Sequence, residues 1–212
     1  MARVWRVGHR SDPCGFVPRH LYKWYNRFDD SQKKYRTLYC ANSLFTCLRE
    51  LLADLRPNTR AIADFETCFG ASSDAGLTVA GVVSWQWRQA HGLVNAETII
   101  HCGKFADIES LTLRREIEHR HPTLLRDHGF RHFDLSEIRA RDRPVTQAIS
   151  RGFFDEGRAG VRFASRLDGL ACYALFEGRA SLKLCGKPIP LTKNIPELVR
   201  VCGEFTLVLR PA

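Results

Sequence analysis

Residues 37–52 constrain the fold of this 212-residue chain more than any other stretch. Residues 37–40 combine β-branched and aromatic side chains, which favours a mostly buried strand. Asn42 and Ser43 follow, and both residue types cap helix N-termini because their side-chain oxygens accept hydrogen bonds from free backbone N–H groups. The sequence therefore predicts a strand that leads directly into a helix.

The predicted helix has one leucine-rich face. Its apolar residues recur at helical spacing, at Leu44, Cys47, Leu48, Leu51, Leu52 and Leu55. Arg56 precedes a proline, which disfavours the helical conformation and ends the helix. Glu50 lies at the margin of this face, where a carboxylate costs free energy unless it is paired or used. Tyr39 likewise carries a hydroxyl into a buried strand, so both residues are candidates for function as well as for ordinary structural roles.

The rest of the chain mixes strands and helices without regular βαβ alternation. Further strands are predicted over residues 3–7, 77–85, 97–101, 130–133, 181–184 and 205–209, and helices over residues 107–119, around 124–125 and over 144–156. Residues 160–165 and 170–176 should pair as a hairpin, because Asp168-Gly169 between them is a turn signal. We expect an α+β fold in a single domain, residues 1–212, with mixed, mostly antiparallel sheets and flanking helices.

Composition narrows the class of protein. The apolar fraction of 44% excludes a disordered chain. No apolar run approaches the roughly 20 residues that span a bilayer, and the first residues lack a signal-peptide pattern. We therefore expect a soluble cytoplasmic protein without membrane contact. The eight cysteines include no C-x-x-C pair, so we expect reduced core residues and no metal site.

The net charge of +9 favours anionic partners. The richest basic cluster is Arg139, Arg141 and Arg143, preceded by Arg126 and Arg131. It is either a solvated basic face, a site for the phosphate groups of a nucleotide, or a surface for an acidic partner protein. Direct nucleic-acid binding is not expected, because no recognition motif is visible.

Three blocks, in order along residues 3–176, resemble the RES domain, a bacterial family named for arginine, glutamate and serine. The first is Val4-Trp5-Arg6-Val7. The second is Arg27-Phe28-Asp29 followed by Leu38-Tyr39-Cys40-Ala41 and the helix with Glu50. The third is Gly160-Val161-Arg162-Phe163-Ala164-Ser165 followed by the apolar strand of the hairpin. The chain departs from the family pattern at Asn26, where a glycine is common, and at Ala164, where a proline is usual.

The resemblance implies a fold similar to ADP-ribosyltransferases and consumption of NAD+ as a substrate, with no bound cofactor. It also implies the toxin of a toxin–antitoxin pair, restrained by a DNA-binding antitoxin of the Xre type. The expected reaction is cleavage of the nicotinamide–ribose bond, with water (an NAD+ glycohydrolase) or inorganic phosphate (a phosphorylase) as acceptor.

Residue roles follow from the same resemblance. Glu50 would hold the ribose hydroxyls and offset positive charge at an oxocarbenium-like centre. Tyr39 would be an aromatic platform, and Arg6 and Arg27 would bind the pyrophosphate, because a guanidinium matches phosphate oxygens. Ser165 would donate a hydrogen bond near the ribose or the acceptor.

Alternatives to this reaction remain. A close variant transfers ADP-ribose to a protein. A second class is a non-catalytic module of the same fold that binds a nucleotide or an acidic partner through its basic face. A third is a basic nucleic-acid binder, whose affinity would depend steeply on salt.

Overall fold

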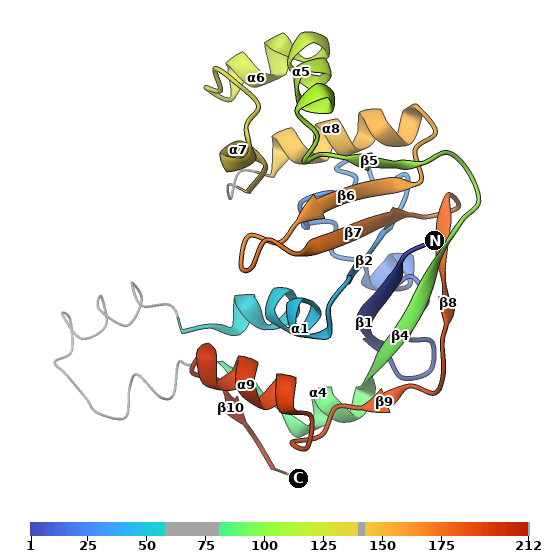
Figure 1. The fold of residues 1–212 in the computed structure, drawn as a ribbon, viewed down its shortest axis with the longest axis vertical. Helices are drawn as coiled ribbons and strands as arrows, with labels where there is room; N and C mark the ends of the chain where they lie inside the picture. The colour runs from blue at the N-terminus through green and yellow to red at the C-terminus, as the bar shows by residue number, and fades with distance from the viewer. Residues whose placement is uncertain (58–80, 140–142, 212) are drawn as a thin grey trace, which may run out of the picture.

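The computed structural model describes residues 1–57, 81–139 and 143–211. Within them, one eight-stranded sheet organises the molecule (Figure 1). Its strand order is β5 (Phe105–Asp107), β6 (Gly160–Ala164), β7 (Ala171–Phe176), β2 (Thr37–Ala41), β1 (Arg3–His9), β4 (His91–Ile100) and β8 (Ala180–Leu184), and β9 (Ile189–Pro190) pairs with β4. Only the β5–β6 pair is parallel in this sheet. The predicted α+β fold with a mostly antiparallel sheet is confirmed.

Helices gather in two groups (Figure 1). One group contains α1 (Leu44–Leu52), the turn η2 (Ala53–Leu55), α4 (Trp85–Ala90) and α9 (Pro196–Glu204); the other contains α5 (Leu111–Arg120), α6 (Pro122–Asp127), α7 (Leu135–Arg139) and α8 (Pro144–Asp155), and a turn η1 (Arg19–Leu21) lies apart. Helix α1 packs against α9, and α8 packs against β6. A two-stranded parallel sheet joins β3 (Val82–Val83) to β10 (Val208–Leu209).

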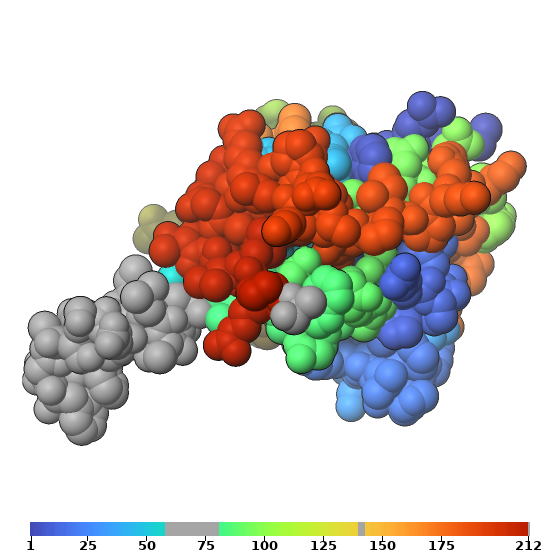
Figure 2. All heavy atoms as spheres, turned by 90° about the horizontal axis from the view of Figure 1, so that it is seen from below, coloured from blue at the N-terminus to red at the C-terminus, as the bar shows by residue number. Residues whose placement is uncertain are grey.

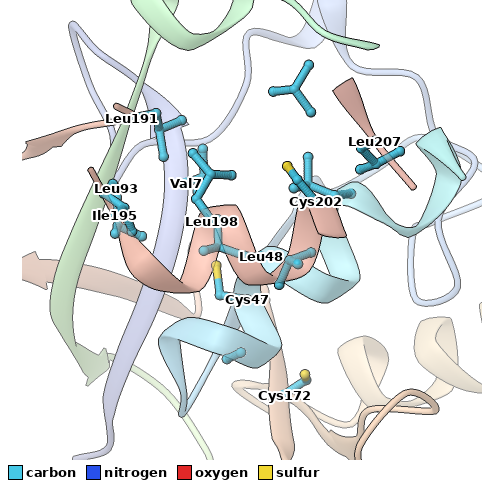
Figure 3. Packing of buried hydrophobic residues seen from close by; sticks show 14 residues of the cluster. Val7, Cys47, Leu48, Leu93, Cys172, Leu191, Ile195, Leu198, Cys202 and Leu207 are labelled. Atoms are coloured by element: carbon cyan, nitrogen blue, oxygen red, sulfur yellow. The ribbon is translucent and has the colours of Figure 1, made fainter. Parts of the chain in front are cut away.

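Each helix group covers its own hydrophobic core. The first core joins α1 and α9 to the sheet through residues such as Val7, Leu48 and Leu198 (Figure 3). The second lies under α5–α8 and is built around Phe28, Phe133 and similar buried side chains. Figure 2 shows the red C-terminal segment beside the green segment that contains α4. Strands β1 and β2 lie at the centre of the sheet, with α1 directly after β2.

The predicted strand and helix of residues 37–52 form as β2 and α1. Ser43 caps the helix, because its hydroxyl accepts a hydrogen bond from the Thr46 backbone N–H at 3.3 Å. The predicted buried face is wrong at two positions, since Leu51 is 40% exposed and Leu55 is 38% exposed. The α-helix ends at Leu52 and continues as a tighter 3₁₀ turn, which rotates Leu55 away from the core.

The predicted hairpin is also confirmed. Strand β6 pairs with β7 in antiparallel register, with Val161 opposite Ala174. The predicted helix after residue 143 forms as α8. Pro144 lies in its first turn, a position that the fixed φ of proline favours.

Three other predicted strands are wrong in whole or in part. Ser84 caps α4 with its hydroxyl, so Trp85 begins a helix and does not extend a strand; residues 77–80 lie outside the described residues. Residues 130–133 form no strand, because the Phe133 N–H donates to Glu118 at 2.7 Å while its ring enters the core. Of residues 205–209 only β10 is a strand, and the preceding helix α9 is an element that the sequence analysis missed.

Among the described residues, no helix is long and apolar enough to cross a bilayer.

Candidate active site

A cavity of about 400 Å³ lies beside β1 and β2. This volume falls in the range of small-molecule sites. Four predicted site residues line the cavity: Arg6 from β1, Arg27 from the segment between β1 and β2, Tyr39 from β2 and Glu50 from α1. The fifth, Ser165, follows β6 and is hydrogen-bonded to Glu50. The fold therefore brings together all five residues from distant parts of the chain.

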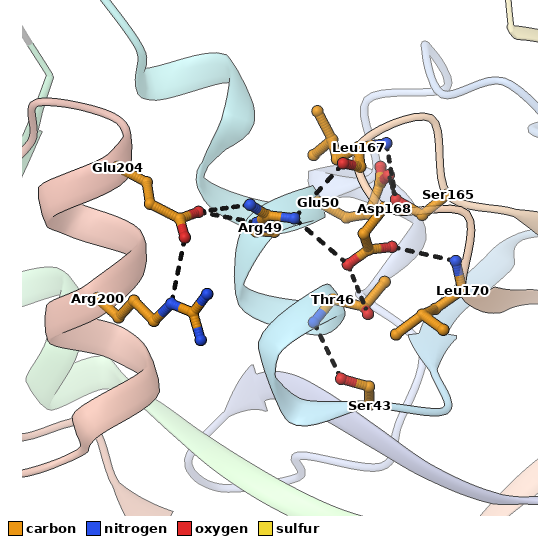
Figure 4. Close-up of polar contacts among 10 residues, drawn as sticks. All are labelled: Ser43, Thr46, Arg49, Glu50, Ser165, Leu167, Asp168, Leu170, Arg200 and Glu204. Atoms are coloured by element: carbon orange, nitrogen blue, oxygen red, sulfur yellow. Dashed lines mark hydrogen bonds and ion pairs between the residues drawn. The ribbon is translucent and has the colours of Figure 1, made fainter.

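Glu50 and Ser165 form a close pair (Figure 4). The Ser165 hydroxyl donates to Glu50 Oε1 at 2.6 Å and accepts from the Leu167 backbone N–H at 3.1 Å. Ser165 is buried, whereas Glu50 is only partly buried and lines the cavity. One carboxylate oxygen is thus held by the protein, and the carboxylate still borders the space that a ligand can enter.

Tyr39 uses its hydroxyl inside the protein. It donates to Asp29 Oδ1 at 3.0 Å and accepts from the Phe28 backbone N–H at 3.0 Å. Tyr22 donates to the same Asp29 oxygen at 2.6 Å. Burial raises the pKa of Asp29, which is fully enclosed, and raises the pKa of Tyr39. The phenol is therefore committed to a structural network, and what Tyr39 offers the cavity is its ring.

Arg6 is held by backbone carbonyls. Its Nε donates to Pro13 O at 3.1 Å, Nη1 donates to Tyr39 O at 3.0 Å, and Nη2 donates to Gly15 O at 3.4 Å. Burial lowers the pKa of this guanidinium. Arg6 therefore joins the loop after β1 to β2 at the wall of the cavity.

Arginines concentrate around Arg27. Arg27 donates to the backbone oxygens of Ile138 and Arg139, the latter at 3.3 Å. Burial lowers the pKa of Arg27, and the nearby charges of Arg166 and Arg143 lower it further, whereas Glu50 acts in the opposite direction. Arg139, Arg143 and Arg166 all line the cavity. Several guanidinium groups near one another favour an anionic ligand, which would offset their mutual repulsion.

Comparison with known proteins identifies the family. The model of the RES domain matches residues 3–194, most of the chain. The chain belongs to the RES domain family. A search of curated proteins found no match.

A solved structure with a similar chain is the M. tuberculosis MbcT–MbcA toxin–antitoxin complex, at 14% identity. The similarity covers 86% of this RES domain chain and 81% of the other chain, with a TM-score of 0.45.

Sequence reasoning found part of the site of this RES domain. The basic cluster at residues 139–143 contributes Arg139 and Arg143 to the cavity wall, and Arg141 lies outside the described residues. Arg166 and Asp29 were missed. Asp29 stands within a family block, and that position is the only signal that could have found it. Arg166 had no signal, because its place beside Arg27 depends on the hairpin packing next to the loop.

The RES domain has no clustered metal ligands within its described residues: no group of three or more His, Cys, Asp or Glu could hold a metal ion. The seven described cysteines are free thiols. Burial raises the pKa of the Cys47 thiol to about 12 and also raises that of Cys172, so both favour the neutral core form.

Proposed function

We propose that this RES domain protein cleaves NAD+ at the nicotinamide–ribose bond. One observation carries the proposal: a single cavity contains both a carboxylate, Glu50, and a group of guanidiniums around Arg27. NAD+ has complementary groups, since its nicotinamide ribose becomes positively charged as the bond breaks and its pyrophosphate is anionic. The cavity thus offers a carboxylate for the ribose and guanidinium groups for the pyrophosphate.

The proposed reaction needs little proton transfer. The C1′–N bond breaks and its electron pair leaves with nicotinamide, which is neutral once released and therefore a good leaving group. The ribose passes through an oxocarbenium-like state, and Glu50 stabilises the developing positive charge. Ser165 supports this role, because its hydrogen bond fixes one Glu50 oxygen, and the carboxylate, which borders the cavity, could then meet the ribose hydroxyls of a bound NAD+.

The acceptor then forms a new bond to C1′. Attack by water releases a proton and gives ADP-ribose, whereas attack by inorganic phosphate gives ADP-ribose 1-phosphate. Transfer to a protein side chain is a variant of the same step.

The arginines would bind the pyrophosphate in this proposal. Arg27, Arg143 and Arg166 are the candidates, because they border one cavity and raise the local positive potential. Arg6 supports the site differently: its donors hold backbone carbonyls, which keeps the wall next to Tyr39 in place. The Tyr39 ring would then serve as the platform against which the nicotinamide or its ribose packs.

The test is direct incubation of the purified protein with NAD+, with and without phosphate. We expect release of free nicotinamide, with ADP-ribose or ADP-ribose 1-phosphate as the second product according to the acceptor. Thermal stabilisation by NAD+ without nicotinamide release would contradict the proposed reaction and favour a non-catalytic nucleotide-binding module.

We also propose that the protein is the toxin of a toxin–antitoxin pair, restrained by an antitoxin of the Xre type. The net charge of +9 supports an acidic partner surface. Expression of the chain alone should stop growth and deplete cellular NAD+, and co-expression of the antitoxin should restore both. Growth arrest with unchanged NAD+ would contradict the link between toxicity and the proposed reaction.

A further inference from the structure

The turn that follows β6 places Ser165 next to Glu50. Its own backbone is tightly closed: the Ser165 N–H donates to Leu170 O at 2.8 Å, and the Gly169 N–H donates to Ser165 O at 2.9 Å. Gly169 adopts a φ of 75°, a left-handed conformation that glycine reaches without strain. Asp168 Oδ1 accepts from the Leu170 N–H at 3.1 Å. These hydrogen bonds tie Ser165, Asp168 and Leu170 into one closed turn.

Three side chains of α1 face this turn (Figure 4). Thr46, Arg49 and Glu50 are three and four residues apart, so they share one side of the helix. Thr46 Oγ1 donates to Asp168 Oδ2 at 2.9 Å, and Arg49 Nη1 lies 3.8 Å from the same oxygen. The contact between Thr46 and Asp168 thus attaches the turn to α1, in addition to the hydrogen bond between Ser165 and Glu50 and one from Arg49 Nη1 to Leu167 O at 3.4 Å.

The attachment is enclosed and charged. Thr46 is fully buried, and the Asp168 side chain is 13% exposed. Arg49 is also fixed from its other side by Glu204 of α9, through hydrogen bonds of 2.9 and 2.6 Å. A largely enclosed carboxylate would be costly to leave unpaired, so its hydroxyl donor and the guanidinium beside it favour this position of the turn on α1.

Neither Thr46 nor Asp168 lines the cavity. They are therefore not substrate contacts there, and an effect of either residue on the chemistry would act through neighbours such as Ser165 and Glu50. Because a hydrogen bond weakens steeply with distance and angle, a small shift of the turn would loosen the 2.6 Å contact between Ser165 and Glu50.

We propose that Thr46 and Asp168 are positioning residues for the reaction: their hydrogen bond seats the β6–β7 turn on α1 so that Ser165 orients Glu50. The inference rests on the proposed cleavage of NAD+ and assigns two residues outside the cavity to it.

A matched pair of variants tests the role of the hydroxyl. Thr46→Val removes it at nearly constant volume, and Thr46→Ser retains it. We expect Thr46→Val to lower kcat for nicotinamide release by about tenfold with KM for NAD+ changed less than about twofold, since a misplacement of the order of 1 Å costs up to about 100-fold. Thr46→Ser should restore kcat. Equal kcat in the two variants would overturn the proposal.

A control separates positioning from a general loss of stability. Thr98 is another buried threonine, on β4, whose hydroxyl accepts from the Ala2 N–H at 2.9 Å and which is not part of the cavity wall. Thr98→Val loses one partly buried hydrogen bond and should leave kcat unchanged. A tenfold loss in this control as well would overturn the positioning role.

The route through Ser165 is tested by combining variants. In a Ser165→Ala background, the hydrogen bond between Ser165 and Glu50 is already absent. Thr46→Val should then lower kcat by less than about twofold, because coupled residues are non-additive. An undiminished tenfold effect in that background would contradict action through Ser165.

Crystal structures of the two Thr46 variants decide the inference even if the wild-type protein releases no nicotinamide, a result that would refute the proposed function itself. The hydrogen bond between Ser165 and Glu50 should be broken in Thr46→Val and intact in Thr46→Ser. A 2.6 Å contact retained in Thr46→Val would overturn the inference.

Discussion

Single polar side chains around the cavity are satisfied by the protein in different ways. The Tyr39 hydroxyl lies between Asp29 and a backbone N–H, whereas the Glu50 carboxylate keeps access to the cavity. A group whose hydrogen bonds are complete supports structure, and one that still borders empty space is available to a ligand. This difference separates the two residues in the proposed reaction.

Removal of the Tyr39 hydroxyl should affect stability more than chemistry. Tyr39→Phe leaves the Phe28 N–H unpaired, so we expect the free energy of unfolding to fall by about 1–3 kcal/mol, measured in urea. Nicotinamide release should persist because the ring remains, whereas Tyr39→Ala should abolish it. As a control, Tyr35→Phe removes a buried hydroxyl that contacts Ser150 at 3.0 Å, away from the cavity. If Tyr39→Phe were as inactive as Tyr39→Ala, the hydroxyl itself would be needed for the reaction.

Arg166 should contribute to binding of NAD+ and not to the bond-breaking step. It is exposed and lines the cavity near Arg27. Arg166→Ala should raise KM by about tenfold at low salt, the loss of roughly one hydrogen bond to a charged group, with kcat unchanged. The difference should shrink as salt screens the charge. Arg3→Ala, at an arginine outside the cavity, is the control, and an equal rise in KM there would refute a local role for Arg166.

The candidate site shows which residues can be predicted from sequence. Glu50 and Tyr39 stood out because each is a polar residue within an apolar pattern. Asp168 was recognised only as part of a turn, and Thr46 and Arg166 had no signal. Their roles depend on contacts between segments more than 100 residues apart in sequence, such as the 122-residue separation of Thr46 from Asp168. No local pattern encodes such a pairing.

At the scale of elements, α1 connects the core to the site. Its inner face packs Cys47, Leu48 and Leu52 into the core that it shares with α9, and another side faces the turn at Ser165. The position of Glu50 is therefore set by how the helix is packed.

A buried leucine of α1 and the exposed leucine of the turn after it should contribute differently to the free energy of unfolding. Leu48→Ala leaves a cavity in the core and should cost about 2–5 kcal/mol of unfolding free energy. Leu55→Ala, at a 38% exposed position just past the helix, should cost at most about 1 kcal/mol. Chemical unfolding of both variants measures the difference. Equal losses would mean that the helix is not anchored by its Leu48 face.

Elements with strong local signals were predictable, and those made by tertiary packing were not. Ser43 predicts the start of α1 because serine favours the N-cap position, and Pro144 predicts the start of α8 because proline favours the first turn of a helix. Helix α9 contains two valines, a cysteine and a glycine, which weaken any local helix preference. It forms because Leu198, Val201 and Cys202 bury one face in the core.

At the scale of the whole molecule, pH should change the free energy of unfolding through ion pairs that join distant segments. Glu177, just after β7, accepts from Arg36 and lies 3.0 Å from Arg19. The hydrogen bond from Arg36 is the main cause that lowers the pKa of Glu177 below its ordinary 4.5. The Glu177 carboxylate therefore binds a proton more readily in the unfolded chain than in the folded protein. Because of this difference, the free energy of unfolding rises with pH over the range in which Glu177 titrates.

Acid should accordingly weaken the fold through Glu177. As pH falls from about 5 to 3, the free energy of unfolding of the wild type should drop, and Glu177→Gln should show a shallower drop because its side chain does not titrate. Arg36→Gln should also make the drop shallower, since it removes the main cause of the lowered Glu177 pKa, while the Arg36 backbone N–H and Arg19 remain. Superimposable slopes for wild type and both variants would contradict a contribution of this ion pair.

The sheet order of the whole molecule lay beyond sequence analysis. Alternation and turn signals predicted strands and one hairpin, but not that β1 lies between β2 and β4 or that β8 pairs with β4. The pairing of β1 with β2 brings Arg6 and Tyr39 onto neighbouring strands, and Glu50 lies on the helix that follows β2. The fold class could therefore be derived locally, while the geometry of the cavity required the complete structure.

The central claim is that the Glu50 carboxylate stabilises the breaking nicotinamide–ribose bond. Its most direct test compares nicotinamide release by Glu50→Gln with release by Glu97→Gln, a glutamate on β4 outside the cavity. We expect Glu50→Gln to remain folded and to lower kcat by about 100-fold or more, as expected for loss of a charge at the transition state, and Glu97→Gln to match the wild type. Wild-type turnover by Glu50→Gln would contradict the claim.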